Sequence, residues 1–396
     1  MNAYLVNGFR SPIGRYGGTL LPLRATEVAT TVAEGLLQRL NVPPASVRRV
    51  IGGMVLQDMT ESNPARIVAT RLGIPHEVPA FTVNMQCCSS MLAVILAAQQ
   101  VALGEVDTVL ALGMESMSNA PHMVHGARWG LRMADGDFVD TLRECTLAGS
   151  RMWGEPWYMI DVAEHHAEVD GVSRTEMDEY AIVSHTRALA AIDAGRLEGE
   201  IVPIEVPAGK GRTTHFEQDE HPRREIAMES LARLNPVKQD GVITAGNAAG
   251  LNDGSAAALI CNDEGLARLG LEPLAKILMP GTAMVGCEPT LMGYSCVEAL
   301  DASLASAGKR VDDLDLIECN EGFAVQLLAC ERMGQWPRER LNVDGGSVAL
   351  GHPVGMSGLR IVLHLAHALE HRGLRLGGAT VPAGSGLGTA VLLERA

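Results

Sequence analysis

The amino-acid sequence predicts an α/β fold in which two similar halves share the chain with an inserted middle segment. Short apolar runs alternate with helical patterns near the start of the chain, and the same alternation returns near its end. Between them, from about residue 120 to residue 239, the sequence is charged, irregular and methionine-bearing. Alternating strands and helices are typical of a mostly parallel sheet with helices on both faces, so we expect such a sheet here.

The first half carries four predicted strands and two predicted helices. Strand-like apolar runs span residues 3–8, 47–57, 80–84 and 107–114. Residues 25–40 repeat apolar side chains at helical spacing. Residues 89–103 are apolar nearly all round, which predicts a buried helix between the last two strands.

The second half repeats this order of strands and helix. Strands are predicted at residues 313–319, 340–346 and 375–383, and a helix at residues 355–373 lies between the last two. In the middle segment, residues 173–196 predict a helix that Ser173 caps, with Glu176 three residues on. This middle segment is expected to cover a site.

Two glycine-rich loops complete the pattern. Residues 244–258 are expected to precede a helix, and residues 383–390 to follow a strand. The second loop contains the spacing Gly-Ser-Gly-Leu-Gly from Gly384, which looks like a dinucleotide-binding fingerprint. Because it lies at the chain end and no βαβ unit follows, that function is excluded.

Composition narrows the class of protein. A chain of 396 residues predicts two or three domains, and aromatic residues make up only 4%, so the core should be aliphatic and methionine-rich. A net charge of -15 argues against nucleic acid or an anionic membrane as partner. The start of the chain lacks a signal-peptide pattern, and no apolar run reaches the length of a membrane span. We therefore expect a cytoplasmic protein.

The eight cysteines form no CxxC pair and no regular ladder of spacings. They predict reduced thiols rather than a disulfide framework, and no metal site. His165 and His166 are adjacent, and neighbours on a helix point about 100° apart, which disfavours joint ligation of a metal.

Cys87 and Cys88 stand side by side in the stretch FTVNMQCCSSM, directly before the buried helix. Backbone N–H groups at a helix start favour negative charge, so we expect a lowered thiol pKa for Cys87. A chance pair of small core residues is the alternative, because cysteine is commonly buried.

His352 and Asn320 are the candidate partners of such a thiol. His352 is fixed between glycine and proline in GGSVALGHPVGMSG, which suits a base better than His364 or His367 on an apolar helix face. A structural turn histidine is the alternative. Asn320 follows a strand in ECNEGFA and could hold a water or a carbonyl, although an ordinary Asx turn explains this position equally well.

Taken together, these motifs resemble those of the thiolase family, the acetyl-CoA C-acyltransferases. The stretches RSPIG, VNMQCCSS, GMESMSNAPH, DEHPR, TAGNAAGLNDG, NEGFA and GGSVALGHPVGMSG follow in the family's order along nearly the whole chain. The resemblance implies two similar α/β halves in a five-layer α-β-α-β-α arrangement with an inserted loop domain. Accordingly, residues 1–119 with 248–271 should form the first half, 120–247 the loop domain over coenzyme A, and 272–396 the second half.

The resemblance also implies roles for single residues. Cys87 would be acylated, and His352 would activate its thiol and help to bind the thioester oxygen. Asn320 would hold a water in one oxyanion hole, while the N–H of Gly384 would join that of Cys87 in the other. Residues expected to contact coenzyme A or the acyl group are Arg223, Ala249, Met159, Met292 and Phe323. The family further implies acyl-CoA and CoA as substrates, no tightly bound cofactor, and a homodimer or homotetramer.

Departures from the family pattern concentrate at the acyl site. Pro382 stands where the family has its second acid/base cysteine, and Gly322 stands where a related branch places that cysteine. Ile160 and Ala249 replace a usual glycine and serine. The chain is thus identified as a divergent member.

Three hypotheses follow for the activity. In the first, the protein is an acyltransferase that cleaves or forms a β-ketoacyl-CoA. In the second, it passes the acyl group to water or a heteroatom nucleophile, or does aldol-type chemistry; in the third, it is a non-catalytic subunit. The acyl chain, the direction, the substitute for the missing cysteine and the choice of dimer or tetramer stay open at this stage.

Overall fold

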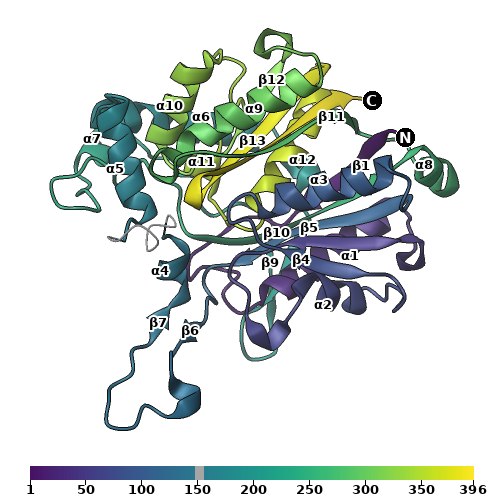
Figure 1. The fold of residues 1–396 in the computed structure, drawn as a ribbon, viewed down its shortest axis with the longest axis horizontal. Coiled ribbons are helices and arrows are strands. Elements are labelled where there is room, and N and C mark those ends of the chain that lie inside the picture. The colour runs from purple at the N-terminus through teal and green to yellow at the C-terminus, as the bar shows by residue number, and fades with distance from the viewer. Residues whose placement is uncertain (148–155) are drawn as a thin grey trace.

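A ten-stranded mixed sheet organises the computed structural model, which describes residues 1–147 and 156–396 (Figure 1). In spatial order its strands are β12 (Leu316–Cys319), β13 (Leu376–Ala383), β14 (Leu387–Arg395), β11 (Ala275–Gly286), β1 (Ala3–Arg10), β10 (Asn252–Cys261), β5 (Thr108–Ser116), β3 (Arg49–Gly53) and β4 (Ala80–Val83), and β2 (Gly14–Arg15) pairs with β10. The sheet is continuous because β1 pairs antiparallel with β11 at its centre.

Two similar halves meet at the β1–β11 pair. Moving outward on either side, one antiparallel strand comes first, β10 or β14, and the next strand, β5 or β13, is again antiparallel to it. Beyond these, β3 lies parallel to β5, and β12 lies parallel to β13. The same order of pairings in both halves agrees with the repeat expected from the sequence.

The expectation of a mostly parallel sheet is wrong. Within the named strands of the described residues, only β3–β4, β3–β5 and β12–β13 are parallel pairs. Parallel neighbours need a long crossover, whereas β13 and β14 are separated only by the short turn Gly384–Gly386. That turn forces the second strand to run back beside the first.

Helices form three layers around the two parts of the sheet. On the outer face of the first half lie α1 (Ala25–Arg39) and α2 (Pro64–Arg71), and on that of the second half lie α9 (Ser295–Ser306) and α10 (Ala324–Gly334). Between the halves, α3 (Ser89–Ala102) packs directly against α12 (Ser357–Arg372) (Figure 1). This gives the expected α-β-α-β-α layering.

Strand β5 shows why the inner strands read as unbroken apolar runs. Val109 and Ala111 belong to the core that includes α3 and α12, while Leu110 and Leu112 belong to the core under α1. Successive side chains of a strand point to opposite faces, and both faces are covered by helices.

The inserted segment between β5 and β10 is built from short elements. They are β6 (His122–Met123), β7 (Val139–Asp140), α4 (Thr141–Cys145), α5 (Met159–Val169), α6 (Arg174–Asp193), β8 (Ile204–Pro207), β9 (Thr213–Phe216) and α7 (Met228–Ala232). The arm that carries β6 and β7 extends away from the body (Figure 1). The capping of α6 is confirmed, because the Ser173 hydroxyl accepts from the Glu176 N–H.

Two strand and helix predictions are wrong. Residues 340–346 form no strand, because Leu341 makes only a single bridge to Ile317 and Asn342 has a left-handed backbone. The loop 244–258 runs into strand β10 and not into a helix. Since β10 is buried on both faces, its small apolar residues give no alternation that would reveal a strand.

All eight cysteines are free thiols, as predicted. Two further helices are short: α8 (Asp263–Leu269) follows β10, and α11 (Ser347–Leu350) precedes the loop of His352. Across residues 1–147 and 156–396, no helix has both the length and the apolarity that crossing a membrane requires.

Candidate active site

Cys87 lies in a tight turn between β4 and α3. Gln86 has a left-handed backbone with φ of 50°, and the Ser89 hydroxyl closes the turn by donating to the Gln86 carbonyl at 2.5 Å and accepting from the Met85 N–H at 2.9 Å. Cys88 is the residue before the first turn of α3 and is fully buried, with its thiol 3.2 Å from the Val381 carbonyl. Cys87 remains partly exposed, so it is the cysteine of the pair that a substrate can reach.

The expected lowering of the Cys87 pKa is wrong for the free protein. Burial raises the pKa of the Cys87 thiol to about 12, and Cys88 and Glu115 add to this rise. The backbone N–H groups of Cys87 and Gly384 act in the opposite direction, because they stabilise negative charge on the sulfur. Removal of the thiol from water outweighs these donors, and Cys87 needs a base before it can attack.

The turn Gly384–Gly386 lies against the Cys87 turn. A side chain at Gly384 would come within 2.7 Å of the Gln86 Oε1 and 3.4 Å of the Met159 sulfur, which explains the glycine. The Gln86 Nε2 donates to the Ser385 hydroxyl at 3.4 Å, joining the two turns. The predicted pairing of Cys87 with Gly384 therefore brings two backbone donors to one thiol.

His352 stands before α12 and is held from several sides. Its N–H donates to the Asn252 Oδ1 at 2.9 Å, and its Nδ1 lies 2.7 Å from the Ser357 hydroxyl. Ser357 donates its own proton to the Pro353 carbonyl at 2.9 Å, so the Ser357 oxygen must accept from the Nδ1–H of His352. The proton is thus on Nδ1, and Nε2 carries the free lone pair.

Burial, aided by the positive charge of Arg360, lowers the pKa of His352 to about 4. The imidazole is therefore neutral at pH 7 and can accept a proton at Nε2. A neutral thiol and a neutral imidazole form the resting state, and neither group carries a charge before substrate arrives.

Asn320 follows β12 and points its amide at the histidine. Its Nδ2 lies 3.5 Å from the His352 Nε2, while its Oδ1 accepts from the Ser347 hydroxyl at 2.7 Å. Arg360 donates to the same Ser347 oxygen at 3.3 Å. Because the Oδ1 is occupied by Ser347, the donor end of the amide is directed towards His352.

Sequence analysis missed Ser347 and Arg360 because their roles depend on contacts across elements. Glu115 was also missed. This buried carboxylate on β5 accepts N–H bonds from Val55, Leu56 and Gly355 at 3.0, 3.1 and 2.9 Å, tying the loop after β3 to the loop of His352. Burial raises the pKa of Glu115 to about 7. Its signal in the sequence was an acidic residue ending an otherwise apolar strand.

Cys145, at the end of α4, is a fourth missed residue. Its thiol donates to the Leu142 carbonyl at 3.0 Å and borders a cavity of about 710 Å³ that Gln86 also lines. Burial raises the pKa of Cys145 to about 12, and the neighbouring charges of Glu115 and Cys87 contribute to the rise. The thiol therefore lies within electrostatic range of the candidate nucleophile.

The residues predicted to contact the acyl group lie around the same turn. Met159 begins α5 and packs in one small cluster with Met292, Val162 and Trp157. Its sulfur approaches Gly384, as described above. Pro382 is fully buried in β13, one residue beyond Val381, whose carbonyl binds Cys88. At this position of β13 the side chain is therefore a proline ring, which has no ionisable group.

The residues predicted to contact coenzyme A follow one path over the surface. Arg223 is exposed, and its guanidinium donates to the Ala245 carbonyl at 3.5 Å. Ala249, further along the same loop, donates its N–H to the Gly322 carbonyl at 3.1 Å, and Phe323 bridges to Ala248. The loop therefore runs from Arg223 to the segment that carries Asn320.

A partly exposed cysteine whose thiol accepts from two backbone donors, together with a buried neutral imidazole, is a set of groups suited to acyl transfer through a cysteine thioester. Residues 3–264 match the thiolase N-terminal domain model, and residues 271–395 match the thiolase C-terminal domain model. The chain belongs to the thiolase family.

Relatives extend over the full chain. It is 41% identical over 396 residues to an acetyl-CoA acetyltransferase of Chromobacterium violaceum, with 100% of both chains covered. It is 40% identical to one of Pseudomonas aeruginosa, over 99% of this chain and 98% of the relative. Among solved structures, the Bacillus anthracis acetyl-CoA acetyltransferase matches with a TM-score of 0.95 at 39% identity, covering 100% of this chain and 99% of that one. Human mitochondrial 3-ketoacyl-CoA thiolase in complex with CoA matches with a TM-score of 0.94 at 38% identity, covering 100% and 98%. The predicted thiolase fold is confirmed.

Proposed function

We propose that this protein is a thiolase-type acyltransferase that carries an acyl group on Cys87 and cleaves or forms a β-ketoacyl-CoA. The observation that carries this proposal is the free Nε2 of a neutral His352, 3.5 Å from the amide nitrogen of Asn320. The family membership and the acetyltransferase relatives support it.

In the first half-reaction, His352 accepts the thiol proton at Nε2 as the Cys87 sulfur attacks the carbonyl carbon of the acyl-CoA. The carbonyl oxygen becomes an oxyanion, which the N–H groups of Cys87 and Gly384 stabilise. The carbon–sulfur bond to coenzyme A then breaks, and the His352 proton goes to the leaving thiolate. An acyl-cysteine and free CoA remain. Two aligned backbone donors act most strongly where water is excluded.

In condensation, the second half-reaction removes a proton from the carbon next to an acyl-CoA carbonyl, and in cleavage the proton returns to that carbon. Pro382 has no ionisable group for this step. We propose that the Cys145 thiol, which burial keeps protonated, donates this proton to the carbon in cleavage, because the thiol borders the cavity next to Gln86 and lies within electrostatic range of Cys87. The Asn320 Nδ2, whose donor end is directed into the site, stabilises the enolate oxygen in this scheme.

Substrate binding is proposed along the path described above. Arg223 would contact the adenine end of coenzyme A, Ala249 and Phe323 its pantetheine arm, and Met159 and Met292 the acyl group. The CoA complex of the human mitochondrial 3-ketoacyl-CoA thiolase supports coenzyme A as the ligand of this fold. No tightly bound cofactor enters the scheme.

Intact-protein mass spectrometry tests the proposal. The protein is incubated with acetyl-CoA, and separately with acetoacetyl-CoA plus CoA, next to the matched variants Cys87→Ala and Cys88→Ala. We expect one acyl adduct in the wild type and in Cys88→Ala, none in Cys87→Ala, and acetyl-CoA as the product of thiolysis. Absence of any adduct with acyl-CoAs of several chain lengths would contradict the proposal.

A second candidate function is favoured by Pro382 alone. The acyl-cysteine would be transferred to water or a heteroatom nucleophile, or used in aldol-type chemistry, without a carbanion at the acyl-CoA. An adduct that hydrolyses while no β-ketoacyl product forms would support this candidate over the first. Pro382→Cys is expected to raise thiolysis if the rest of the site suits that reaction.

The Cys145 assignment has its own test. Cys145→Ser should lower β-ketoacyl-CoA formation about 10²-fold or more, within the range of a positioned acid or base, while Cys87 is still acylated by acetyl-CoA. The matched control is Cys287→Ser, which removes another partly buried thiol. Equal condensation rates in wild type and Cys145→Ser would remove Cys145 from the mechanism.

We further propose that the protein is a cytoplasmic homodimer or homotetramer divided as expected from the sequence: residues 1–119 with 248–271, 120–247, and 272–396. Strand β4 ends the sheet on one side, leaves one edge open and is only partly buried. Such an edge is a ready site for pairing with a second copy. Size-exclusion chromatography with light scattering measures the number of copies, and a monomer would contradict this part.

A further inference from the structure

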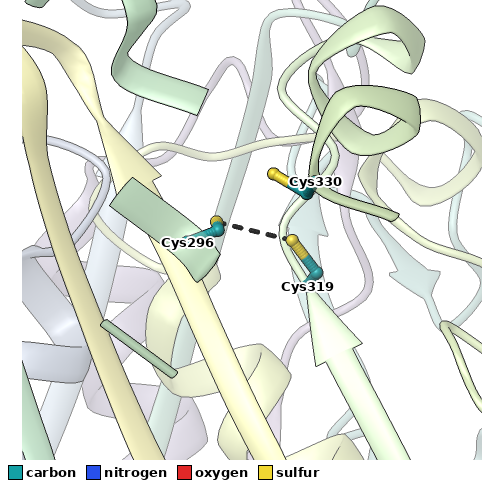
Figure 2. A group of neighbouring side chains, drawn as sticks. All are labelled: Cys296, Cys319 and Cys330. Atoms are coloured by element: carbon teal, nitrogen blue, oxygen red, sulfur yellow. Dashed lines mark hydrogen bonds between the residues drawn. The ribbon is translucent and has the colours of Figure 1, made fainter. Parts of the chain in front are cut away.

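Three cysteines converge in the core of the second half, behind the segment that carries Asn320. Cys296 begins α9, Cys319 ends β12 and Cys330 lies on α10 (Figure 2). Their sulfur atoms all lie within 4.8 Å of one another, and those of Cys319 and Cys296 are 3.4 Å apart. All three side chains are buried. Neither the Cys87 chemistry nor the coenzyme A path uses them.

The side chain of Gln326 is directed into this thiol cluster. Its Nε2 lies 3.4 Å from the Cys330 sulfur, 3.8 Å from that of Cys319 and 4.0 Å from that of Cys296. Its Oε1 is fixed by the Gly322 N–H at 3.1 Å, so the donor end faces the sulfurs. An N–H group aimed at several sulfurs favours thiolate over thiol, as hydrogen-bond donors to the ligand atoms do at metal–thiolate sites.

Hydrogen bonds also distribute charge within the cluster. Although burial raises it, bonds from Cys296, Cys319 and Gln326 together hold the pKa of Cys330 below its ordinary value. The pKa values of Cys296 and Cys319 are raised, with burial as the largest cause. The Cys330 thiol also donates to the Gly293 carbonyl at 3.0 Å, which fixes the position of its sulfur beside the other two.

Among residues 1–147 and 156–396, no further histidine, cysteine or carboxylate joins the three sulfurs as a fourth ligand. The nearby His166 uses its Nε2 to accept from the Gly293 N–H at 3.1 Å, and its Nδ1 contacts Asp170 at 2.9 Å. The backbone of Cys319 is fixed on both sides by the Asn342 side chain, at 2.8 and 2.9 Å. The three sulfurs thus have preset positions and no imidazole to complete a tetrahedral site.

We propose that Cys296, Cys319 and Cys330 form a buried binding site for one thiophilic d10 cation of low coordination number, of the copper(I) class. Thiolates select soft ions, and zinc sites are almost always four-coordinate. A three-sulfur shell with metal–sulfur bonds near 2.3 Å needs sulfur–sulfur distances of about 3.8 to 4.0 Å. The three sulfurs lie within 4.8 Å of one another, so small side-chain shifts reach this spacing. Binding displaces the thiol protons to solvent and requires no oxidant or reductant.

The test is an anaerobic titration of the full-length protein with copper(I) held by a competing colorimetric chelator. We expect one equivalent to leave the chelator, with the absorption of copper-bound thiolate, and a first shell of sulfur alone by X-ray absorption. Cys330→Ser should weaken binding at least tenfold. Cys261→Ser removes a buried thiol elsewhere, whose sulfur donates to the Thr108 hydroxyl at 3.6 Å, and should bind as the wild type does.

The variant Cys87→Ala tests whether the accessible Cys87 thiol binds the copper(I). This variant should still take up one equivalent of copper(I). Failure of the proposed acyl transfer would leave this result untouched, since the sites share no residue. No transfer from the chelator, or equal transfer to wild type and Cys330→Ser, would overturn the proposal. If Cys330→Ser does not give the wild-type circular dichroism spectrum, Cys296→Ala replaces it with the same expected loss.

Discussion

Both halves carry a candidate catalytic residue on the turn before a central helix, but a different element leads into each turn. In the first half a strand leads through a turn into α3 and presents Cys87; in the second, the loop after α11 leads into α12 and presents His352. The two helices pack against each other in the central layer, and their starts are joined by the Leu359 N–H, which donates to the Ser90 hydroxyl at 2.9 Å. Corresponding central helices therefore follow turns that carry two different chemical groups.

The two turns differ in how firmly they hold their side chain. The Cys87 turn is closed by Ser89 and leaves the thiol partly exposed, whereas His352 is fixed at both its backbone and its Nδ1 and is buried. Protein around both groups favours their neutral forms. The Cys87 thiol therefore depends on His352 as its base, because the start of α3 alone does not ionise the thiol.

The largest expected effect comes from removing the thiol of Cys87, on the turn before α3. Cys87→Ala should abolish acyl transfer, since no other described thiol lies both in reach of the Gly384 N–H and next to His352. Steady-state thiolysis and the mass of the protein after exposure to acyl-CoA measure the loss. Residual turnover comparable to the wild type would mean that the two turns do not divide the chemistry in this way.

Removing the imidazole of His352, on the turn before α12, should have the next largest effect. His352→Asn should lower the acylation rate by about 10²–10⁴-fold, the usual contribution of a positioned base, because the thiol with pKa of about 12 is then left protonated. Single-turnover acylation followed by mass spectrometry checks this. His371→Asn, at the exposed end of α12, is the matched control and should change nothing.

The pH dependence sharpens the comparison further. The pKa of His352 is lowered to about 4, so the neutral base persists through pH 5 to 7 and the acylation rate should fall only as pH drops towards 4. The same shift contributes stability that is present above pH 6.5 and is lost as pH falls through about 4. Rate profiles in wild type and Glu115→Gln separate this titration from that of Glu115, whose pKa is about 7. An inflection at pH 6.5 in the rate profiles of both proteins would contradict the lowered pKa of His352.

A smaller effect is expected for the residue that orients Asn320. Ser347→Ala frees the Asn320 Oδ1 and removes a hydrogen bond whose net contribution is about 0.5–1.5 kcal/mol, so kcat should fall by up to about tenfold with KM unchanged. Ser184→Ala is the matched control, because Ser184 donates to Glu321 and not to Asn320. Equal effects of both variants on kcat would assign Ser347 a merely structural role.

Residue identity and order in the chain already indicated much of this site. A cysteine before an apolar helix, a histidine between glycine and proline, and an asparagine after a strand were all found from local pattern. Those patterns are local because each depends on one strand end or one turn. Residues 340–346 and 244–258 were misread since burial on both faces, or a single bridge, erases the alternation that marks a strand.

Other features could not be read from the chain. Glu115 acts on the Cys87 thiol from β5, and Cys145 comes within range of Cys87 only when the inserted segment folds over the first half. Ser347 orients Asn320 across 27 positions of sequence. The spacing of the eight cysteines predicted no cluster, yet three of them meet because α9, β12 and α10 pack together.

The sequence by itself therefore determined the two α/β halves, the family and the identity of the candidate nucleophile and base, because these follow from patterns and motifs along the chain. Only the tertiary structure decided the protonation states of Cys87 and His352, the direction in which the Asn320 amide points, and the meeting of Cys296, Cys319 and Cys330. The physical reason is that a pKa, a shared hydrogen bond and a ligand cluster all depend on what packs around a group, and packing is set by elements far apart in the chain.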